Sequence, residues 1–306
     1  MMEKKKVSIG YFADGPWAHL AFKKIMQDQS LAIKFICVRN DKRDAVLCRY
    51  AQENGIDLLY TPNINADDFV EKMKKYACDL FVSMSFDQIF REKMIHLPPF
   101  KTINCHAGKL PFYRGRNILN WVLINDEKEF GITVHYVDPG IDTGDIILQD
   151  TYEISDFDTY ATLLERAYEG CADILYRAIK QIQAGEVIRI RQDSIDAVGL
   201  YCGQRREGDE IINWNQTSRN IFNFIRALTA PGIGATSYLD GKEIKILESK
   251  MIKGARSYIN IPGQILNKDR EGLIVKTQDT IIKVTKYEFD GKIRVGQRMG
   301  GQNDRR

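Results

Sequence analysis

The chain has 306 residues, a length that predicts one large and one smaller domain. Hydrophobic residues make up 44% and charged residues 28%, a composition typical of a folded protein. The 44 basic and 41 acidic residues leave a net charge of +3, too small to predict nucleic-acid binding by itself. No stretch approaches the ~20 apolar residues of a membrane helix. The six cysteines are widely spaced, without a CxxC pair and without a His at metal-ligand spacing. This spacing predicts a reducing cytoplasm and no metal site.

The N-terminal part alternates strand-like and helix-like patterns. An alternating segment at 6–12 leads into the loop ADGPW and then into apolar residues at helical spacing. Further strands are expected at 32–38, 56–62, 78–84 and 102–106, with helices at 43–54 and 66–76 between them. This order predicts an α/β fold, a Rossmann-like and mostly parallel sheet with helices on both faces.

A sheet of this kind binds ligands beyond the carboxyl ends of its strands. Here those ends lead into the loops ADGPW, RNDKR, SFDQIF and the segment after TINCH. The GxGxxG fingerprint is missing after the first strand, which disfavours a nicotinamide enzyme, and no Walker-type phosphate loop is present.

The C-terminal part has a different pattern. A long amphipathic helix is expected at 156–183, begun by Asp156 or Asp158 and ended by Gly185. A helix around 222–228 and short strands within 244–289, separated by Gly, Asn and Asp, follow it. We therefore expect a catalytic domain at 1–200 and, at 201–306, a linker helix with a small β-barrel that resembles oligonucleotide-binding (OB) folds.

The most informative chemistry lies between Asn104 and Asp145. Strand alternation in TINCH places Asn104 and His106 on one face. An Asn amide can donate to a developing oxyanion, and a neutral His can take a proton near pH 7. Asp142, on a Pro-Gly loop, is the carboxylate expected to orient the histidine or relay the proton. Each residue alone also has a structural explanation, as a strand-end or turn residue; their combination favours catalysis of acyl transfer.

This stretch is recognisable as a family signature. NCHAGKLPFYRG and GIDTGDII resemble the two halves of the signature of 10-formyltetrahydrofolate-dependent formyltransferases, with Asn104, His106 and Asp142 matching its triad. Most of the chain resembles the methionyl-tRNA formyltransferase family in the order and length of its parts. One departure is Ala107-Gly108-Lys109, where Gly or Ala followed by Ser and Leu is commoner.

The resemblance implies a mechanism in which an amine attacks the formyl carbon of 10-formyltetrahydrofolate. Asn104 would stabilise the oxyanion, His106 would assist that stabilisation or the proton movement, and Asp142 would accept or relay the proton. Which group takes the proton stays open. By family position the pterin lies between two loops and is held largely by backbone groups, at Ser85, Asp87, Gln88, Ile89, Val137, Asp138 and Gly140.

The family divides by the amine it formylates. Methionyl-tRNA formyltransferases usually carry a long basic insertion after the second strand, whereas here RNDKRDAVLCRYAQENG runs almost directly into the helix. YRGRNILNW resembles sugar N-formyltransferases, which implies a nucleotide-linked amino sugar as the partner, with Arg116 on its diphosphate. The residues implied in acceptor binding are Tyr113, Arg116, Asn120, Arg205 and Trp214, although Trp214 has an equally good explanation as a core residue.

The leading hypothesis is a sugar N-formyltransferase acting on a dTDP- or UDP-linked amino-deoxy sugar, such as a 4-amino-4,6-dideoxyhexose for O-antigen, lipopolysaccharide or another surface polysaccharide. A methionyl-tRNA formyltransferase is the first alternative. A nucleic-acid-binding protein with an OB-like barrel is the second, disfavoured by the intact triad and by the lack of clustered aromatic and basic residues on the barrel strands. The resemblance also implies a homodimer.

Overall fold

The computed structural model describes residues 6–301. The chain forms two compact units: one comprises Met1–Gly115, Phe130–Tyr152 and Glu165–Cys202, and the other comprises Arg116–Glu129, Glu153–Leu164 and Gly203–Arg306. Two internal segments therefore group with the C-terminal unit, whereas the boundary expected near residue 200 assigns them to the catalytic domain.

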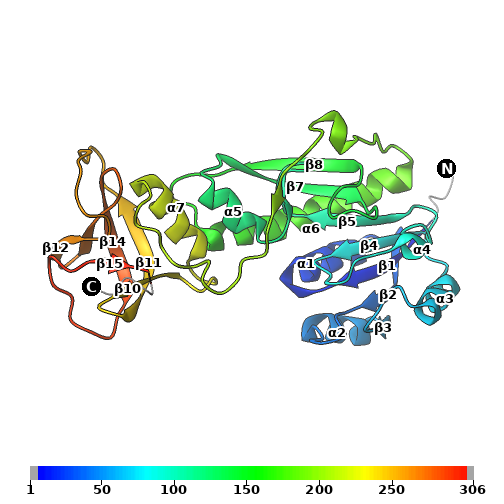
Figure 1. The fold of residues 1–306 in the computed structure, drawn as a ribbon. Coiled ribbons are helices and arrows are strands. Elements are labelled where there is room, and N and C mark those ends of the chain that lie inside the picture. The colour runs from blue at the N-terminus through cyan, green and yellow to red at the C-terminus, as the bar shows by residue number, and fades with distance from the viewer. Residues whose placement is uncertain (1–5, 302–306) are drawn as a thin grey trace. The chain divides into compact units, whose positions relative to one another are not determined.

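The first unit is built on a seven-stranded sheet of order β3-β2-β1-β4-β5-β7-β8 (Figure 1). The strands from β3 to β5 are parallel, and β7 runs antiparallel to β5. The predicted α/β fold with a mostly parallel sheet is thus confirmed. Its elements, some of which extend into the second unit, are β1 (Val7–Ala13), α1 (Gly15–Met26), β2 (Leu31–Cys37), α2 (Ala45–Glu53), β3 (Asp57–Leu59), α3 (Asp67–Tyr76), β4 (Leu80–Met84), α4 (Glu92–Ile95), β5 (Thr102–His106), β6 (Arg114–Gly115), β7 (Glu129–Tyr136), β8 (Ile146–Glu153), α6 (Tyr160–Ala184), the 3₁₀ helix η1 (Gln192–Ser194) and β9 (Tyr201–Cys202).

An aromatic cluster fills the core on one side of β1. The Phe12 ring makes edge contacts with Phe35, Phe81 and Phe90 at centroid distances of 5.4, 5.3 and 5.0 Å. Gly10 is needed beside this cluster, because a Cβ there would lie 2.4 Å from the Phe35 ring. The packing fixes β1 and β4 in the middle of the sheet, and their carboxyl ends lead into the loops expected to bind ligand.

The long helix α6 ends as predicted, at Gly185 in the left-handed conformation (φ 71°). Its start differs from the prediction, because the first helical residue is Tyr160. The Asp158 carboxylate accepts from the Ser155 N–H (2.7 Å) and hydroxyl (2.9 Å) and so closes the turn before the helix.

The second unit contains a six-stranded sheet of order β12-β13-β14-β11-β10-β15 with antiparallel neighbours. An antiparallel bridge between Gln264 and Arg298 joins its two edges, so the sheet closes into the small barrel that was predicted. Helix α7 packs against β11 and contributes Ile221, Phe222 and Ile225 to the barrel core. The elements are α5 (Ile118–Ile124), α7 (Ser218–Leu228), β10 (Ala235–Leu239), β11 (Lys242–Met251), β12 (Ile265–Asp269), β13 (Gly272–Lys276), β14 (Ile281–Glu288) and β15 (Met299–Gly300).

Across residues 6–301, no helix combines the length and the apolar character needed to span a membrane. All six cysteines are free thiols. The same range holds no group of three or more His, Cys, Asp or Glu side chains arranged to bind a metal ion.

Candidate active site

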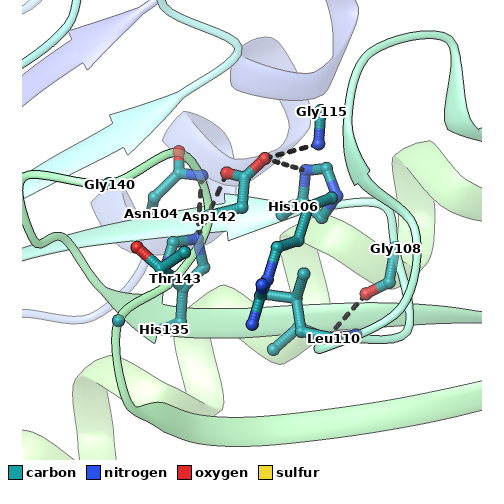
Figure 2. A network of polar contacts seen from close by, with 12 residues as sticks. Asn104, His106, Gly108, Leu110, Gly115, His135, Gly140, Asp142 and Thr143 are labelled. Atoms are coloured by element: carbon teal, nitrogen blue, oxygen red, sulfur yellow. Dashed lines mark hydrogen bonds and ion pairs between the residues drawn. The ribbon is translucent and has the colours of Figure 1, made fainter. Parts of the chain in front are cut away.

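The antiparallel strand β7 brings a second histidine beside Asn104. In the β5–β7 register Asn104 faces His135, whose side chain is only 2% exposed. The His135 Nδ1 lies 2.8 Å from the Tyr136 carbonyl oxygen, so Nδ1 carries a proton and donates it. Nε2 of the neutral ring can then accept from the Asn104 Nδ2, 3.2 Å away. Figure 2 shows this pair next to Asp142.

Asp142 projects from a tight turn toward both histidines. Its Oδ2 accepts from the Gly115 N–H at 2.9 Å and lies 3.7 Å from His106 Nδ1, while its Oδ1 lies 3.6 Å from His135 Nε2 (Figure 2). Burial acts to raise the pKa of the Asp142 carboxyl. The favourable interactions with His106 and His135 and the hydrogen bond from the Gly115 N–H outweigh it and hold that pKa well below its usual range. Asp142 is therefore an anion at neutral pH.

His106 is oriented by a backbone carbonyl. Its Nε2 lies 2.7 Å from the Tyr113 carbonyl oxygen, which can only accept, so Nε2 carries a proton. A Cβ on Gly108 would lie 2.4 Å from both atoms of this hydrogen bond. The departure from the family pattern at residues 107–109 thus has a local reason: in this chain residue 108 has to be glycine for the hydrogen bond to form. The other ring nitrogen, Nδ1, faces Asp142.

The turn that carries Asp142 is shaped by its own side chains. The Asp138 Oδ1 accepts from the Gly140 N–H (3.1 Å) and from the Thr143 hydroxyl (2.6 Å). A Cβ on Gly144 would lie 1.8 Å from the Tyr136 carbonyl oxygen, so the turn can pass this strand end only with glycine. Asp138 and Gly140, predicted to contact folate, are thus also turn-forming residues.

The two loops predicted to bind folate lie against one apolar cluster. Phe86, in the loop from Ser85 to Ile89, and Val137 both pack on the core residues that include Phe90 and Met94. Ser85 is exposed in the left-handed conformation (φ 57°), and Ile89 is 63% exposed. The resemblance implies a flat pterin that is held by main-chain groups. An apolar surface next to exposed residues suits such a ligand.

Two polar side chains of the predicted folate loop have partners within the protein. The Gln88 side chain accepts from the Ile64 N–H (2.9 Å) and donates to the Thr61 carbonyl (2.8 Å), so it anchors a neighbouring loop. The Asp87 carboxylate lies 3.5 Å from the Arg39 guanidinium. The Gln88 amide therefore supports the local loop structure, and its contact with folate stays a prediction.

The residues predicted to bind the acceptor separate into exposed and buried groups. Arg116 is exposed, and its Nη1 donates to the Gln204 side-chain oxygen at 3.1 Å. Arg205 is half-buried and donates through Nη2 to the Asp209 carbonyl (2.8 Å). The Tyr113 side chain is buried, and what this residue offers His106 is its carbonyl.

Asn120 and Trp214 are both buried, and Trp214 takes the core position that the sequence offered as its alternative explanation. The Asn120 side chain is 5% exposed and donates to the Ala227 carbonyl at 2.6 Å, which ties α5 to α7. Trp214 is 3% exposed in the barrel core, where its indole N–H donates to the Ser237 hydroxyl at 3.0 Å. Each side chain thus has a partner inside its own unit, and a contact of either residue with the acceptor stays a prediction.

His135 is the polar residue that the sequence reasoning left out. The run GITVHYVD was not predicted to be a strand, so its histidine could not be aligned with Asn104. Its alternating apolar residues before the Asp138-Pro139 turn are the signal that could have identified it.

The site thus combines an oriented amide donor, two histidines and an ionised carboxylate at the edge of a Rossmann-like sheet. These groups can stabilise an oxyanion and manage a proton, which defines a class of enzymes that transfer acyl groups to a nucleophile.

Comparison with known proteins identifies the class more closely. The formyl transferase family model matches residues 23–179, and the model of the formyl transferase C-terminal domain matches residues 205–299. Methionyl-tRNA formyltransferase of Geotalea daltonii is 31% identical over 245 residues, covering 80% of this chain and 76% of its own. That of Fusobacterium nucleatum is 33% identical over 245 residues, with coverages of 79% and 77%. The chain belongs to the formyltransferase family and is a folate-dependent formyl-transfer enzyme, with 10-formyltetrahydrofolate as the formyl donor.

Solved structures share the fold. The sugar 3N-formyltransferase WlaRD, crystallised with dTDP and 5-N-formyl-THF, superposes with a TM-score of 0.67 at 20% identity, covering 91% of this chain and 97% of its own. An N-formyltransferase of Helicobacter canadensis, in complex with folinic acid and dTDP-3-aminofucose, gives a TM-score of 0.63 at 21% identity, with coverages of 92% and 99%.

Proposed function

We propose that this enzyme formylates the amine of a nucleotide-linked amino-deoxy sugar. The carrier nucleotide is dTDP or UDP. The reaction takes place in the cytoplasm, and the formylated sugar is then used to build a surface polysaccharide. A homodimer is the assembly expected from the resemblance.

The observation that carries the proposal is the segment after β2, where tRNA formyltransferases usually have a basic insertion. Only residues 38–44 separate β2 from α2. The Arg39 guanidinium lies 2.8 Å from Asp41, 3.5 Å from Asp87 and 3.9 Å from Asp14. Its charge is therefore matched by carboxylates. The segment also carries the exposed Lys42 and Arg43, but it is too short to hold the long basic insertion that suits an RNA backbone.

The end of the segment is equally well anchored. The Asp44 Oδ1 accepts from the Val46 and Leu47 N–H groups, both at 2.9 Å, and caps α2. The Asp44 Oδ2 accepts from the Gly15 N–H at 3.0 Å and lies 2.8 Å from His19 Nε2. These contacts place a carboxylate at the N-terminus of α1, which disfavours a phosphate there.

Arg116 supports an anionic acceptor. Its contact with the neutral Gln204 oxygen leaves the positive charge of the guanidinium uncompensated by that partner. Arg116 also follows Gly115, whose N–H holds Asp142. A planar guanidinium at this position suits the diphosphate of a nucleotide sugar.

The protein groups have distinct tasks in the transfer. The folate supplies the formyl group. One N–H of the Asn104 amide goes to His135, and the other can donate to the oxygen on which negative charge develops. As the amine nitrogen bonds to the formyl carbon, His106 Nδ1, opposite the protonated Nε2, can take the amine proton, and the Asp142 carboxylate at 3.7 Å stabilises the resulting imidazolium. The imidazolium can then return the proton to the folate nitrogen as the bond between that nitrogen and the formyl carbon breaks. This geometry supports His106 as the proton acceptor, with Asp142 as its counter-charge.

Initiator methionyl-tRNA is the second candidate acceptor. Sequence relatives that are 31–33% identical over some 80% of the chain are methionyl-tRNA formyltransferases, and this likeness supports the alternative.

A direct assay separates the two. The protein is incubated with 10-formyltetrahydrofolate and either a panel of dTDP- and UDP-linked amino sugars or charged initiator tRNA, and the products are examined by mass spectrometry. We expect a formyl mass gain on at least one sugar nucleotide, absent with His106→Ala. Formylation of the tRNA with no reaction on any sugar would reverse the proposal.

A further inference from the structure

A buried pair of polar side chains lies behind the Asp142 turn. The Gln192 amide donates through Nε2 to two carbonyl oxygens of the turn, those of Asp142 and Gly144, both at 2.8 Å. Its Oε1 accepts from Arg114 Nε at 3.0 Å and from Nη2 at 2.7 Å. Gln192 is 3% exposed and Arg114 is 7% exposed. A single buried amide thus joins the catalytic turn to a buried guanidinium.

Arg114 is in turn fixed from several sides. Its Nη1 donates to the Val198 carbonyl and to the Tyr201 hydroxyl, both at 3.3 Å, and the guanidinium lies 5.2 Å from the Tyr201 ring centroid. A Cβ on Gly199 would lie 2.7 Å from Nη1, and Gly199 has a φ of 70°, so this close approach requires glycine. The partners of Arg114 therefore come from the continuous segment that begins with η1 and ends with β9.

The segment from η1 to β9 also helps to hold the Asp142 carboxylate, through the pairing of β9 with β6. The short strands β6 and β9 pair in parallel, with Arg114 opposite Tyr201 and Gly115 opposite Cys202. This pairing positions the Gly115 N–H, which donates to the Asp142 Oδ2 at 2.9 Å. The Asp142 carboxylate and the Asp142 backbone are thus both held by groups that depend on Arg114 and its neighbours.

We propose that Gln192 and Arg114 are positioning residues for formyl transfer, which fix the Asp142 carboxylate at its distance from the two histidines. Neither touches the reacting groups. Their effect is geometric: with the turn released, Asp142 loses its fixed position relative to His106 Nδ1, and the proton-handling pair is misaligned. The proposal concerns formyl transfer itself and does not depend on the identity of the acceptor.

Gln192→Glu separates positioning from general stability. The side chains are nearly isosteric, and a carboxylate keeps and strengthens the contact with Arg114. The replaced nitrogen, however, becomes an oxygen that faces the Asp142 and Gly144 carbonyl oxygens and cannot donate to them. Arg191→Gln is the matched control, because Arg191 precedes Gln192 in the chain and pairs on the surface with Asp193 (3.0 Å).

We expect Gln192→Glu to lower kcat by about 10- to 100-fold with little change in KM for 10-formyltetrahydrofolate, measured with whichever acceptor the wild-type protein formylates. Hydrogen–deuterium exchange should quicken in peptides covering 138–145 and stay unchanged in β1 and β4. Arg191→Gln should match the wild type in both measurements. Gln192→Met, neutral and of similar length, is the second variant if the glutamate variant fails to fold, and should give the same kinetic and exchange pattern.

Two results would overturn the proposal. One is a wild-type kcat in Gln192→Glu with unchanged exchange at 138–145. The other is a lowered kcat accompanied by faster exchange throughout the sheet, since that would assign Gln192 to overall stability. If no acceptor is found for the wild-type protein, hydrogen–deuterium exchange at 138–145 alone decides whether Gln192 holds the Asp142 turn.

Discussion

Asp142→Asn is the substitution that tests the site most directly. The amide oxygen of an asparagine can still accept from the Gly115 N–H, so the turn keeps this contact. What disappears is the negative charge 3.7 Å from His106 Nδ1 and 3.6 Å from His135 Nε2. Without this counter-charge an imidazolium at His106 is no longer stabilised when the proton moves.

The expected loss in kcat is about 10²- to 10⁴-fold, the usual contribution of positioned acid–base groups. This corresponds to about 2.7–5.4 kcal/mol in the activation barrier. The assay is formyl transfer from 10-formyltetrahydrofolate followed by mass spectrometry. Asp145→Asn, in the same loop, is the control, because the contact that Asp145 makes with Tyr136 is through its backbone carbonyl (2.9 Å). A kcat for Asp142→Asn within tenfold of the wild-type value would refute the role assigned to the carboxylate.

The same variant has a distinct pH signature. The pKa of Asp142 is lowered in the folded protein, so the folded state favours the ionised form and the carboxylate contributes stability above its unfolded pKa. This contribution is lost as the pH falls below about 4 toward the lower folded pKa. Wild-type protein should therefore unfold at a higher Tm than Asp142→Asn at pH 7, and the difference should shrink on acidification. A difference that grows at low pH would contradict the assignment.

Three further outcomes are expected. His135→Phe fills the buried space but removes the acceptor for the Asn104 amide, so kcat should fall about tenfold or more at nearly unchanged Tm; an unaltered kcat would count against this role. Arg116→Gln should raise KM for a nucleotide sugar by about 10- to 100-fold, the equivalent of a charge-assisted hydrogen bond, with kcat retained; equal KM values would remove Arg116 from the acceptor site. Lys276→Met leaves the buried carbonyls of Thr277 and its neighbours without the ammonium donor, and should lower the free energy of unfolding by about 1–3 kcal/mol in denaturant titrations.

The sequence allowed the sheet to be predicted where hydrophobic patterns were simple. The buried strands β1 and β4 and the stop of α6 at Gly185 follow from residue type and periodicity alone. The antiparallel strand β7 was missed. Its pairing with β5 is a long-range contact, and the local alternation in GITVHY does not indicate which strand it pairs with. The position of His135 depends on this pairing, so the residue could not be assigned.

The residues assigned to the acceptor show a second limit of prediction from sequence. Asn120 and Trp214 were assigned to the acceptor by resemblance, with a core position as the alternative for Trp214, and each side chain hydrogen-bonds a group within the second unit. Residue type does not distinguish an amide that ties two helices together from one that binds a ligand. Gln192 illustrates the converse, since nothing in the run RQDSID marks its amide as the link between the Asp142 turn and Arg114.

The interleaving of the two units limits how the chain can be shortened. A truncation at residue 202 removes α7 but retains Arg116–Glu129 and Glu153–Leu164, which belong to the unit that is lost. The buried residues of α5, among them Leu119 and Val122, would lose the packing against α7, and the Asn120 amide would lose the Ala227 carbonyl. Such a fragment would expose an apolar surface and aggregate, so formyl transfer by this protein has to be studied on a chain that carries both units.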